Sequence, residues 1–184
     1  MGRITFITGG ARSGKSTYAE NLAKESGKEI TYVATSIAFD EGMKNRIKKH
    51  QQQRPREWAT IEKYCDFHEV VDTKEYQQSQ ILLVDCITVM ICNLMMDSGL
   101  DFDNCSPEEV DKLEKQVIAE VEGLLLLSEE KELIIVSNEL GMGLVPAYKM
   151  GSYYRDIAGR INQLIASKAD HVFLVVSGLQ IKLK

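Results

Sequence analysis

The sequence has no long hydrophobic run and no excess of positive charge, and both absences limit its function. No stretch approaches the roughly 18 consecutive apolar residues of a membrane-spanning helix, and no apolar run follows a basic start as in a secretory signal peptide. We therefore expect a cytoplasmic protein with no membrane span. The formal net charge is −5, so the chain lacks a general basic surface and we expect no nucleic-acid partner.

Repeats, linkers and low-complexity segments are also missing, and the cysteines follow no known pattern. Cys65, Cys86, Cys92 and Cys105 stand at spacings that fit neither a zinc site nor a redox motif, and a reducing compartment would keep them as thiols. The 184 residues have the length of one domain, and 44% hydrophobic content is enough for a buried core. We expect a single domain, residues 1–184, with no tail.

What the sequence does contain is a glycine-rich loop near its start. Residues 9–16 read G-x-x-x-x-G-K-S, after an apolar segment typical of a strand (4–8) and before helix-forming residues (17–24). In such a loop the backbone N–H groups surround phosphates, while the lysine reaches the terminal phosphates and the serine ligates Mg²⁺. A chance match is the alternative, and the flanking strand and helix favour the phosphate site. The loop residues are Gly9, Gly10, Ala11, Arg12, Ser13, Gly14, Lys15 and Ser16.

Two further expected strands place polar groups at their carboxyl ends. Residues 81–84 are apolar and Asp85 follows them, which matches the P-loop NTPase pattern of a buried strand that presents a carboxylate beside the magnesium. Any buried strand can end in aspartate, but the preceding glycine loop strengthens this interpretation. Thr35 and Ser36 follow the expected strand 30–34, where they either face the ligand crevice or cap the next segment.

A histidine in a basic, helix-forming segment is the second candidate for chemistry. In residues 40–53, His50 follows Met43 and Ile47 at helical spacing, and Arg46 and Arg54 are among the cations around it. A histidine in such a segment is most often merely packed or solvated. The functional interpretation is that neighbouring cations favour the neutral imidazole, which can attack phosphorus, and also hold anionic phosphates.

The rest of the chain predicts an α/β fold. Ser106, Pro107 and Glu109 indicate a capped helix to about residue 127, strands are expected at 133–137 and 172–176, and another helix is expected from Tyr153. Residues 58–62 are a possible strand, residues 66–76 a weak helix candidate, and 177–179 turn into a short tail. The alternation predicts a three-layer P-loop NTPase-like fold with a mostly parallel central sheet and helices on both faces.

Two late features each leave two interpretations open. Gly141 and Gly143, in the loop at 138–146, suit either a plain connection or a backbone that approaches a ligand or a neighbouring subunit. Arg155, Gly159 and Asn162 share one side of the last helix, which is either solvated or a docking edge.

Together these residues resemble the bifunctional adenosylcobinamide kinase and adenosylcobinamide-phosphate guanylyltransferase family of cobalamin biosynthesis, over nearly the whole chain. The resemblance depends on T-G-G-A-R-S-G-K-S at 8–16, A-T-S at 34–36, Arg46-Ile47 with His50, Arg54-Pro55, Trp58, D-C-I-T at 85–88, N-E-L-G-M-G-L-V-P at 138–146, and Arg155-Asp156 with Gly159, Asn162 and Gln163.

The resemblance implies a role for each matching position. His50 would be the nucleophile that becomes guanylylated, Lys15 would act in phosphoryl transfer, and Ser16 and Asp85 would hold Mg²⁺. The loop at 9–16 would bind the triphosphate of GTP or ATP, and members of the family are similar in forming homotrimers. The residues implied to contact the guanine nucleotide are Ala34, Thr35, Ser36, Gln51, Gln52, Gln53, Arg54, Glu62 and Asp85.

The resemblance also implies two reactions on one nucleotide site. Adenosylcobinamide would be phosphorylated by ATP or GTP, and its phosphate would then receive GMP from GTP. Two other functions remain open, namely a P-loop kinase of another small metabolite and a nucleotide-binding regulatory module.

Overall fold

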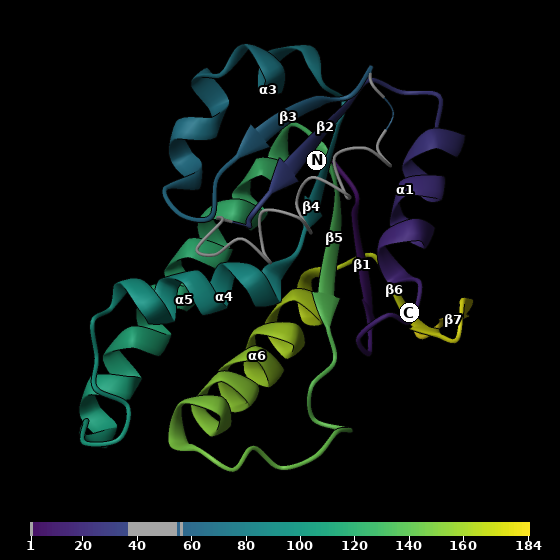
Figure 1. Cartoon of the computed structure of the whole chain (residues 1–184). Helices are drawn as coiled ribbons and strands as arrows, with labels where there is room; N and C mark the ends of the chain where they lie inside the picture. The colour runs from purple at the N-terminus through teal and green to yellow at the C-terminus, as the bar shows by residue number, and fades with distance from the viewer. Residues whose placement is uncertain (1, 37–54, 56) are drawn as a thin grey trace.

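The strands form a single sheet with helices on both faces (Figure 1). The computed structural model describes residues 2–36, 55 and 57–184. In this part of the chain the sheet has seven strands in the order β3-β2-β4-β5-β1-β6-β7, and only the β6–β7 pair is antiparallel. The predicted α/β fold with a mostly parallel sheet is confirmed. The strands are β1 (Ile4–Gly9), β2 (Ile30–Ala34), β3 (Ala59–Glu62), β4 (Ile81–Asp85), β5 (Glu132–Asn138), β6 (His171–Val176) and β7 (Leu179–Lys182).

The helices divide between the two faces of the sheet. Helix α1 packs on one face through Ala19 and Ala23, and α4, α5 and α6 pack on the other (Figure 1). No helix among the described residues is long and apolar enough to cross a bilayer. The helices are α1 (Lys15–Glu25), α3 (Lys74–Gln78), α4 (Ile87–Asp97), α5 (Pro107–Leu126) and α6 (Lys149–Lys168), with 3-10 turns η1 (Phe67–Asp72) and η2 (Leu127–Glu129).

Helix α5 follows its sequence signals closely. The Ser106 hydroxyl accepts a hydrogen bond from the Glu109 N–H at 3.3 Å, and the Glu109 carboxylate accepts one from the Ser106 N–H at 2.8 Å. This reciprocal pair satisfies two amides that a helix start leaves without partners. Val117, Val121 and Leu124 on the inner face are fully buried, so the predicted cap and buried stripe are both confirmed.

Three segments differ from their predictions. Helix α4 was not predicted, helix α6 begins at Lys149 rather than near Tyr153, and the expected terminal tail forms β7. The weak helix candidate at 66–76 is divided, because Thr73 ends η1 and caps α3 by accepting from the Tyr76 N–H.

The carboxyl ends of the parallel strands meet at one edge of the sheet. Ala34 pairs with both Glu62 and Asp85, and Gly9 pairs with Asn138 on β5, which lies between β1 and β4. Ligands of open parallel sheets bind outside this edge. The predicted helix at 40–53, which contains His50, lies outside the described residues.

Candidate nucleotide-binding site

The loop after β1 has the backbone of a phosphate-binding loop. Gly14 precedes α1 with φ +96°, and α1 has neither a side-chain cap nor an acidic residue in its first turn. The N–H groups of that turn therefore have no capping partner from a side chain, which suits an anion. The turn between β6 and β7 contacts the loop and stabilises it, because the Gly178 N–H donates to the Ser13 carbonyl at 2.8 Å.

At two positions of the loop, a side chain larger than glycine would collide with the β6–β7 hairpin. A Cβ at Gly9 would lie 2.4 Å from the carbonyl oxygen of Val175 on β6, and a Cβ at Gly14 would lie 3.2 Å from the Cα of Gly178. Gly10 has nothing within 4 Å of such an atom. The loop is thus held tightly against the β6–β7 hairpin at Gly9 and Gly14 and is open at Gly10.

Lys15 lies inside the loop rather than in solvent. It is 8% exposed, and its Nζ donates to the Gly10 carbonyl at 3.3 Å. Burial lowers the pKa of Lys15, while the nearby Cys86 and Asp85 act in the opposite direction. The lysine is therefore a positioned cation near the end of β4.

A second buried polar group, the Ser13 hydroxyl, also indicates that the loop binds phosphate. The Ser13 Oγ is buried and has no hydrogen-bond partner among the described residues. An unpaired hydroxyl in such a place costs free energy that an acceptor such as a phosphate oxygen would recover. The loop can hold a chain of phosphates through its amides, this hydroxyl and Lys15.

Asp85 and Ser16 are the two residues of this edge whose oxygens could hold Mg²⁺. Ser16 lies in the first turn of α1, and the half-buried Asp85 ends β4. The Tyr32 hydroxyl donates to the Asp85 Oδ2 at 3.0 Å. Across the described part of the chain there is no group of three or more His, Cys, Asp or Glu that could hold a metal. Mg²⁺ needs few protein ligands when phosphates and water supply the rest, so this pair of oxygens fits it.

The residues after β2 differ in accessibility. Ala34 and Thr35 are 5% and 1% exposed, whereas Ser36 is half-buried and Glu62 is exposed at the end of β3. The Thr35 hydroxyl accepts from the Cys86 N–H at 2.9 Å and donates to the Cys86 carbonyl at 2.8 Å. These contacts hold β2 to the backbone that follows Asp85.

The structure brings most of the predicted site residues to one edge. The loop at 9–16, residues 34–36, Glu62 and Asp85 all lie at the carboxyl ends of the strands. The remaining predicted residues, His50, Gln51, Gln52, Gln53 and Arg54, lie outside the described residues.

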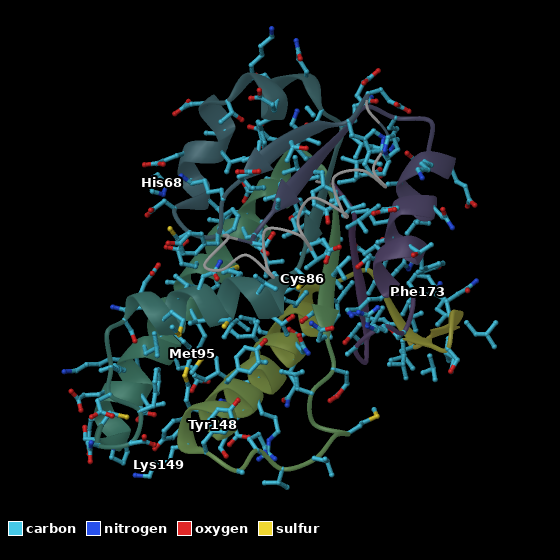
Figure 2. The ribbon with its side chains drawn as sticks, viewed as in Figure 1. His68, Cys86, Met95, Tyr148, Lys149 and Phe173 are labelled. Carbon is cyan, nitrogen blue, oxygen red and sulfur yellow. The ribbon has the colours of Figure 1, made fainter. Side chains whose placement is uncertain are left out.

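The sequence does not reveal the hydrogen bonds through which Thr88, Asn138 and Asn162 support this edge. The Asn138 Nδ2 donates to the Thr88 Oγ1 at 2.6 Å, and the Asn162 Nδ2 donates to the Asn138 carbonyl at 2.9 Å. Figure 2 shows Cys86, two residues before Thr88, near the middle of the molecule where α4 begins. Asn162 is therefore a link from α6 to β5 and not a solvated residue.

The loop between β5 and α6 presents apolar side chains to solvent. Leu144 is 95% exposed, Met142 82%, Val145 75% and Tyr148 67%. Figure 2 shows Tyr148 at the end of the molecule where α6 begins. Several exposed apolar side chains on one loop are typical of a contact surface.

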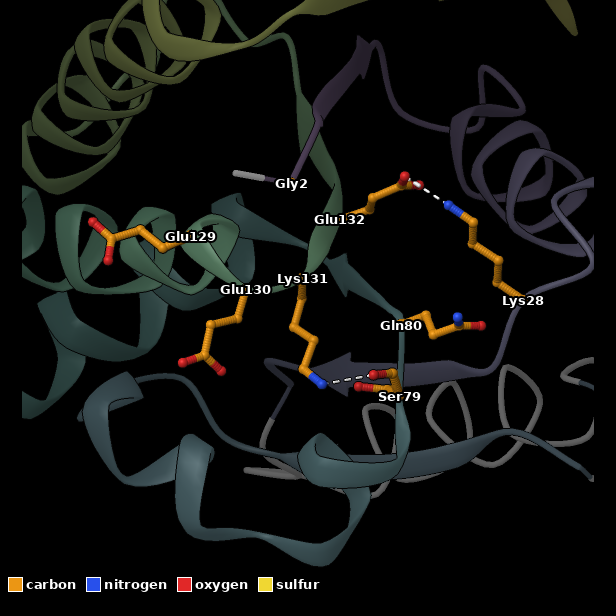
Figure 3. A pocket seen from close by; sticks show the side chains of 8 residues that line it. All are labelled: Gly2, Lys28, Ser79, Gln80, Glu129, Glu130, Lys131 and Glu132. Atoms are coloured by element: carbon orange, nitrogen blue, oxygen red, sulfur yellow. Dashed lines mark hydrogen bonds and ion pairs between the residues drawn. The ribbon is translucent and has the colours of Figure 1, made fainter.

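A pocket at the opposite edge of the sheet lacks these features (Figure 3). Both of its lysines already have partners, because Lys28 contacts Glu132 at 2.6 Å and the Lys131 Nζ donates to the Ser79 carbonyl at 2.7 Å. It lies where β4 and β5 begin, far from the glycine loop. We assign it no part in the site.

Comparisons with known proteins agree with this geometry. The chain is 40% identical to the bifunctional adenosylcobalamin biosynthesis protein CobU of Escherichia coli K12 over 98% of this chain and 99% of that protein. It is 38% identical to CobU of Salmonella typhimurium (98% and 99%) and to CobP of Pseudomonas aeruginosa (97% and 96%).

A solved ATPase from a bacterial type III secretion system has the same fold. It superposes with a TM-score of 0.55 at 14% identity, over 99% of this chain and 58% of the ATPase chain. The sequence model of the family described as cobinamide kinase / cobinamide phosphate guanyltransferase matches residues 5–183. The chain therefore belongs to the CobU family of cobinamide kinases and cobinamide phosphate guanyltransferases.

Proposed function

We propose that this chain, as one catalytic domain, phosphorylates adenosylcobinamide with ATP or GTP and then converts the product to adenosylcobinamide-GDP with GTP. The observation that carries the proposal is the phosphate-binding loop with Lys15 beside Asp85 at the carboxyl edge of the sheet. Membership of the family identifies the acceptor class. All of this chemistry is compatible with a cytoplasmic enzyme, which cell fractionation would test.

In the kinase step, the acceptor hydroxyl of adenosylcobinamide attacks the γ-phosphorus, its proton passes to water, and the bond from the γ-phosphorus to the departing nucleoside diphosphate breaks. The loop amides, the Ser13 hydroxyl and Lys15 bind the phosphate oxygens and stabilise the charge that develops on them. Ser16 and Asp85 would hold Mg²⁺, which supplies further charge neutralisation when bound. The buried position of Lys15 strengthens its electrostatic effect, because little water screens it.

In the transferase step, an imidazole nitrogen of His50 attacks the α-phosphorus of GTP, a P–N bond forms and pyrophosphate leaves. A phosphate oxygen of adenosylcobinamide phosphate then attacks the same phosphorus, the P–N bond breaks and the histidine is restored. This path divides one difficult displacement into two easier ones. Gln51, Gln52, Gln53 and Arg54, which follow His50 in the sequence, are proposed to contact the guanine nucleotide.

The strand order supports a place for the guanosine. With neighbouring strands about 4.8 Å apart, β4 lies about 10 Å from β1 and β3 about 19 Å from it. Glu62 is thus far enough from Lys15 to contact the nucleoside rather than the phosphates. Ala34 and Ser36, one strand nearer, would lie between them.

Labelling with GTP that carries radioactive α-phosphorus tests the transferase. The parent protein should form an adduct that is labile in acid and stable in base, as a phosphoramidate is. His50→Ala should abolish the adduct, whereas His68→Ala, which removes an exposed histidine on η1, should leave it intact. An adduct of normal yield in His50→Ala would disprove the histidine assignment.

Phosphorylation of adenosylcobinamide tests the kinase. Lys15→Ala should lose most of this activity, and Lys24→Ala, which changes an exposed lysine of the same helix, should keep it. If the parent phosphorylates another small metabolite and forms no adduct, the first alternative function holds. If it hydrolyses nucleotide without any acceptor, the regulatory module holds.

We further propose that the protein is a homotrimer in which the loop at 141–148 contacts a neighbouring copy. The support is the exposed apolar set led by Leu144. Light scattering after size-exclusion chromatography should give three times the chain mass of 20.7 kDa. Leu144→Asp should lower that mass, and Leu126→Asp, at a 62% exposed position of α5, should not. A monomeric parent would contradict the proposal.

A further inference from the structure

Two tyrosines in the core hydrogen-bond to carboxylates, and only one of them lies at the site. Tyr32 on β2 is 1% exposed and donates to Asp85 at 3.0 Å, whereas Tyr76 on α3 is 2% exposed and donates to Glu130 at 3.2 Å, away from the glycine loop. Burying a phenol is costly unless its hydroxyl is paired. Phenylalanine would fill either place without that cost, so packing does not explain the Tyr32 hydroxyl.

The sheet register aims Tyr32 at the reacting edge. Tyr32 pairs with Leu83, and Ala34, two residues later, pairs with Asp85. Residues two apart on a strand point to the same face, so the ring of Tyr32 extends along the sheet toward the carboxylate at its edge. The same face carries α1, whose Lys15 is close enough to Asp85 for the carboxylate to affect the lysine pKa.

A second β2 side chain holds the backbone beside this carboxylate. Thr35 uses its single hydroxyl proton on the Cys86 carbonyl and accepts from the Cys86 N–H, and the Asn93 Nδ2 donates to the Thr35 carbonyl at 2.7 Å. Being 1% exposed, Thr35 reaches the site only through Cys86. The end of β2 therefore constrains Asp85 twice, at its carboxylate and at the peptide that follows.

We propose that Tyr32 and Thr35 are positioning residues that hold the Asp85 carboxylate in the orientation that binds Mg²⁺ with the nucleotide. The Tyr32 hydroxyl donates to Oδ2 and restricts rotation of the carboxylate, so that Oδ1 is the oxygen left for the metal. Groups that orient metal-binding side chains in this way typically affect metal affinity 10- to 100-fold, so about that range is expected. The inference rests on the metal role proposed for Asp85.

The test measures the Mg²⁺ dependence of nucleotide binding, without turnover. Binding of a fluorescent GTP analogue is measured over a range of Mg²⁺ concentrations. It is also measured once with excess chelator, so that no free Mg²⁺ is present. Tyr32→Phe should raise the Mg²⁺ concentration for half-maximal binding by about 10- to 100-fold and leave binding in chelator unchanged. Tyr76→Phe, which removes an equally buried hydroxyl, should shift neither value more than about twofold. Thermal unfolding of both variants checks that they are folded.

Three further variants make the result decisive. Asp85→Asn should raise the Mg²⁺ requirement at least as far as Tyr32→Phe. Thr35→Val should also raise the Mg²⁺ concentration needed for half-maximal binding. Thr35→Ser, which keeps the hydroxyl, should bind with the Mg²⁺ requirement of the parent. If Asp85→Asn shifts the requirement and Tyr32→Phe does not, the positioning role is wrong and the metal role stands. If Asp85→Asn has no effect, the metal role fails and the inference fails with it.

Discussion

Replacement of Gly9 by alanine tests whether the phosphate loop is held by its contact with β6. The added Cβ would lie 2.4 Å from the Val175 carbonyl oxygen and 2.7 Å from the Ser13 Oγ. The serine can rotate away. The carbonyl cannot, because Gly9 and Val175 are paired in the parallel ladder between β1 and β6. One strand therefore has to move by more than about half an ångström in a close-packed region.

Overpacking of this kind costs about 1–3 kcal/mol. Urea unfolding, followed through the fluorescence of Trp58, the single tryptophan, would measure it. With a slope of about 2 kcal/mol per molar, a cost of about 2 kcal/mol lowers the midpoint by about 1 M. Because the moved strand carries the loop, GTP binding should weaken as well.

Gly10→Ala is the matched control. Nothing lies within 4 Å of its added Cβ, and Gly10 has no positive φ. Its unfolding free energy without nucleotide should stay within about 0.5 kcal/mol of the parent or rise slightly, because alanine restricts the unfolded chain. Equal midpoints for Gly9→Ala and the parent would refute the steric argument.

Two other predictions concern regions away from the site. Ser106→Ala should lower the unfolding free energy by about 1 kcal/mol, because it removes the cap of α5 that accepts from the Glu109 N–H, while Ser106→Thr should lose much less; unchanged thermal unfolding of the alanine variant would contradict this. Burial and a hydrogen bond to Asp66 raise the pKa of Cys65 to about 11 from 9.0. Alkylation of Cys65 at pH 8 should therefore be about 10- to 100-fold slower than that of a free thiol, and its rate should increase as the pH rises toward 11. Peptide mass spectrometry measures the rate, which Asp66→Asn should increase, and labelling at the speed of a free thiol would disprove the prediction.

The elements that sequence reasoning predicted are those whose signals are local. The cap of α5 and the apolar runs of the parallel strands were found because neighbouring residues determine them. Helix α4 was missed because it is buried on most sides, including Thr88 and Asn93, so it has no clear amphipathic period. Helix α6 begins earlier than predicted, because its first turn contains Gly151, which is a poor helix former and so gives no helix signal. Glycine is needed there because a Cβ would come within 2.8 Å of the Pro146 side chain.

The sequence carries a local signal for strand β7. Ser177 and Gly178 both adopt positive φ, 52° and 82°, as the two-residue turn of a hairpin requires, and Leu179–Lys182 alternates apolar and polar residues. A turn of this type followed by alternation predicts a strand rather than a tail.

The site was predictable in part for the same reason. The glycine loop and Asp85 follow from local motifs. The contact between Tyr32 and Asp85 could not be read from the sequence, because it depends on β2 and β4 being neighbours in register although about fifty residues separate them. Sequence patterns identify residues that chemistry requires, whereas residues that orient them depend on which strands are adjacent.

The contact between Gly178 and the phosphate loop has a consequence for how the protein is made. The loop at 9–16 leaves the ribosome well before the residue that supports it, because the Gly178 N–H that donates to the Ser13 carbonyl belongs to the turn between β6 and β7. During synthesis the nascent chain therefore has a complete loop sequence without a complete loop. Nucleotide binding in its mature form waits for Gly178, and a change in the turn between β6 and β7 acts close to the loop despite its distance in the sequence.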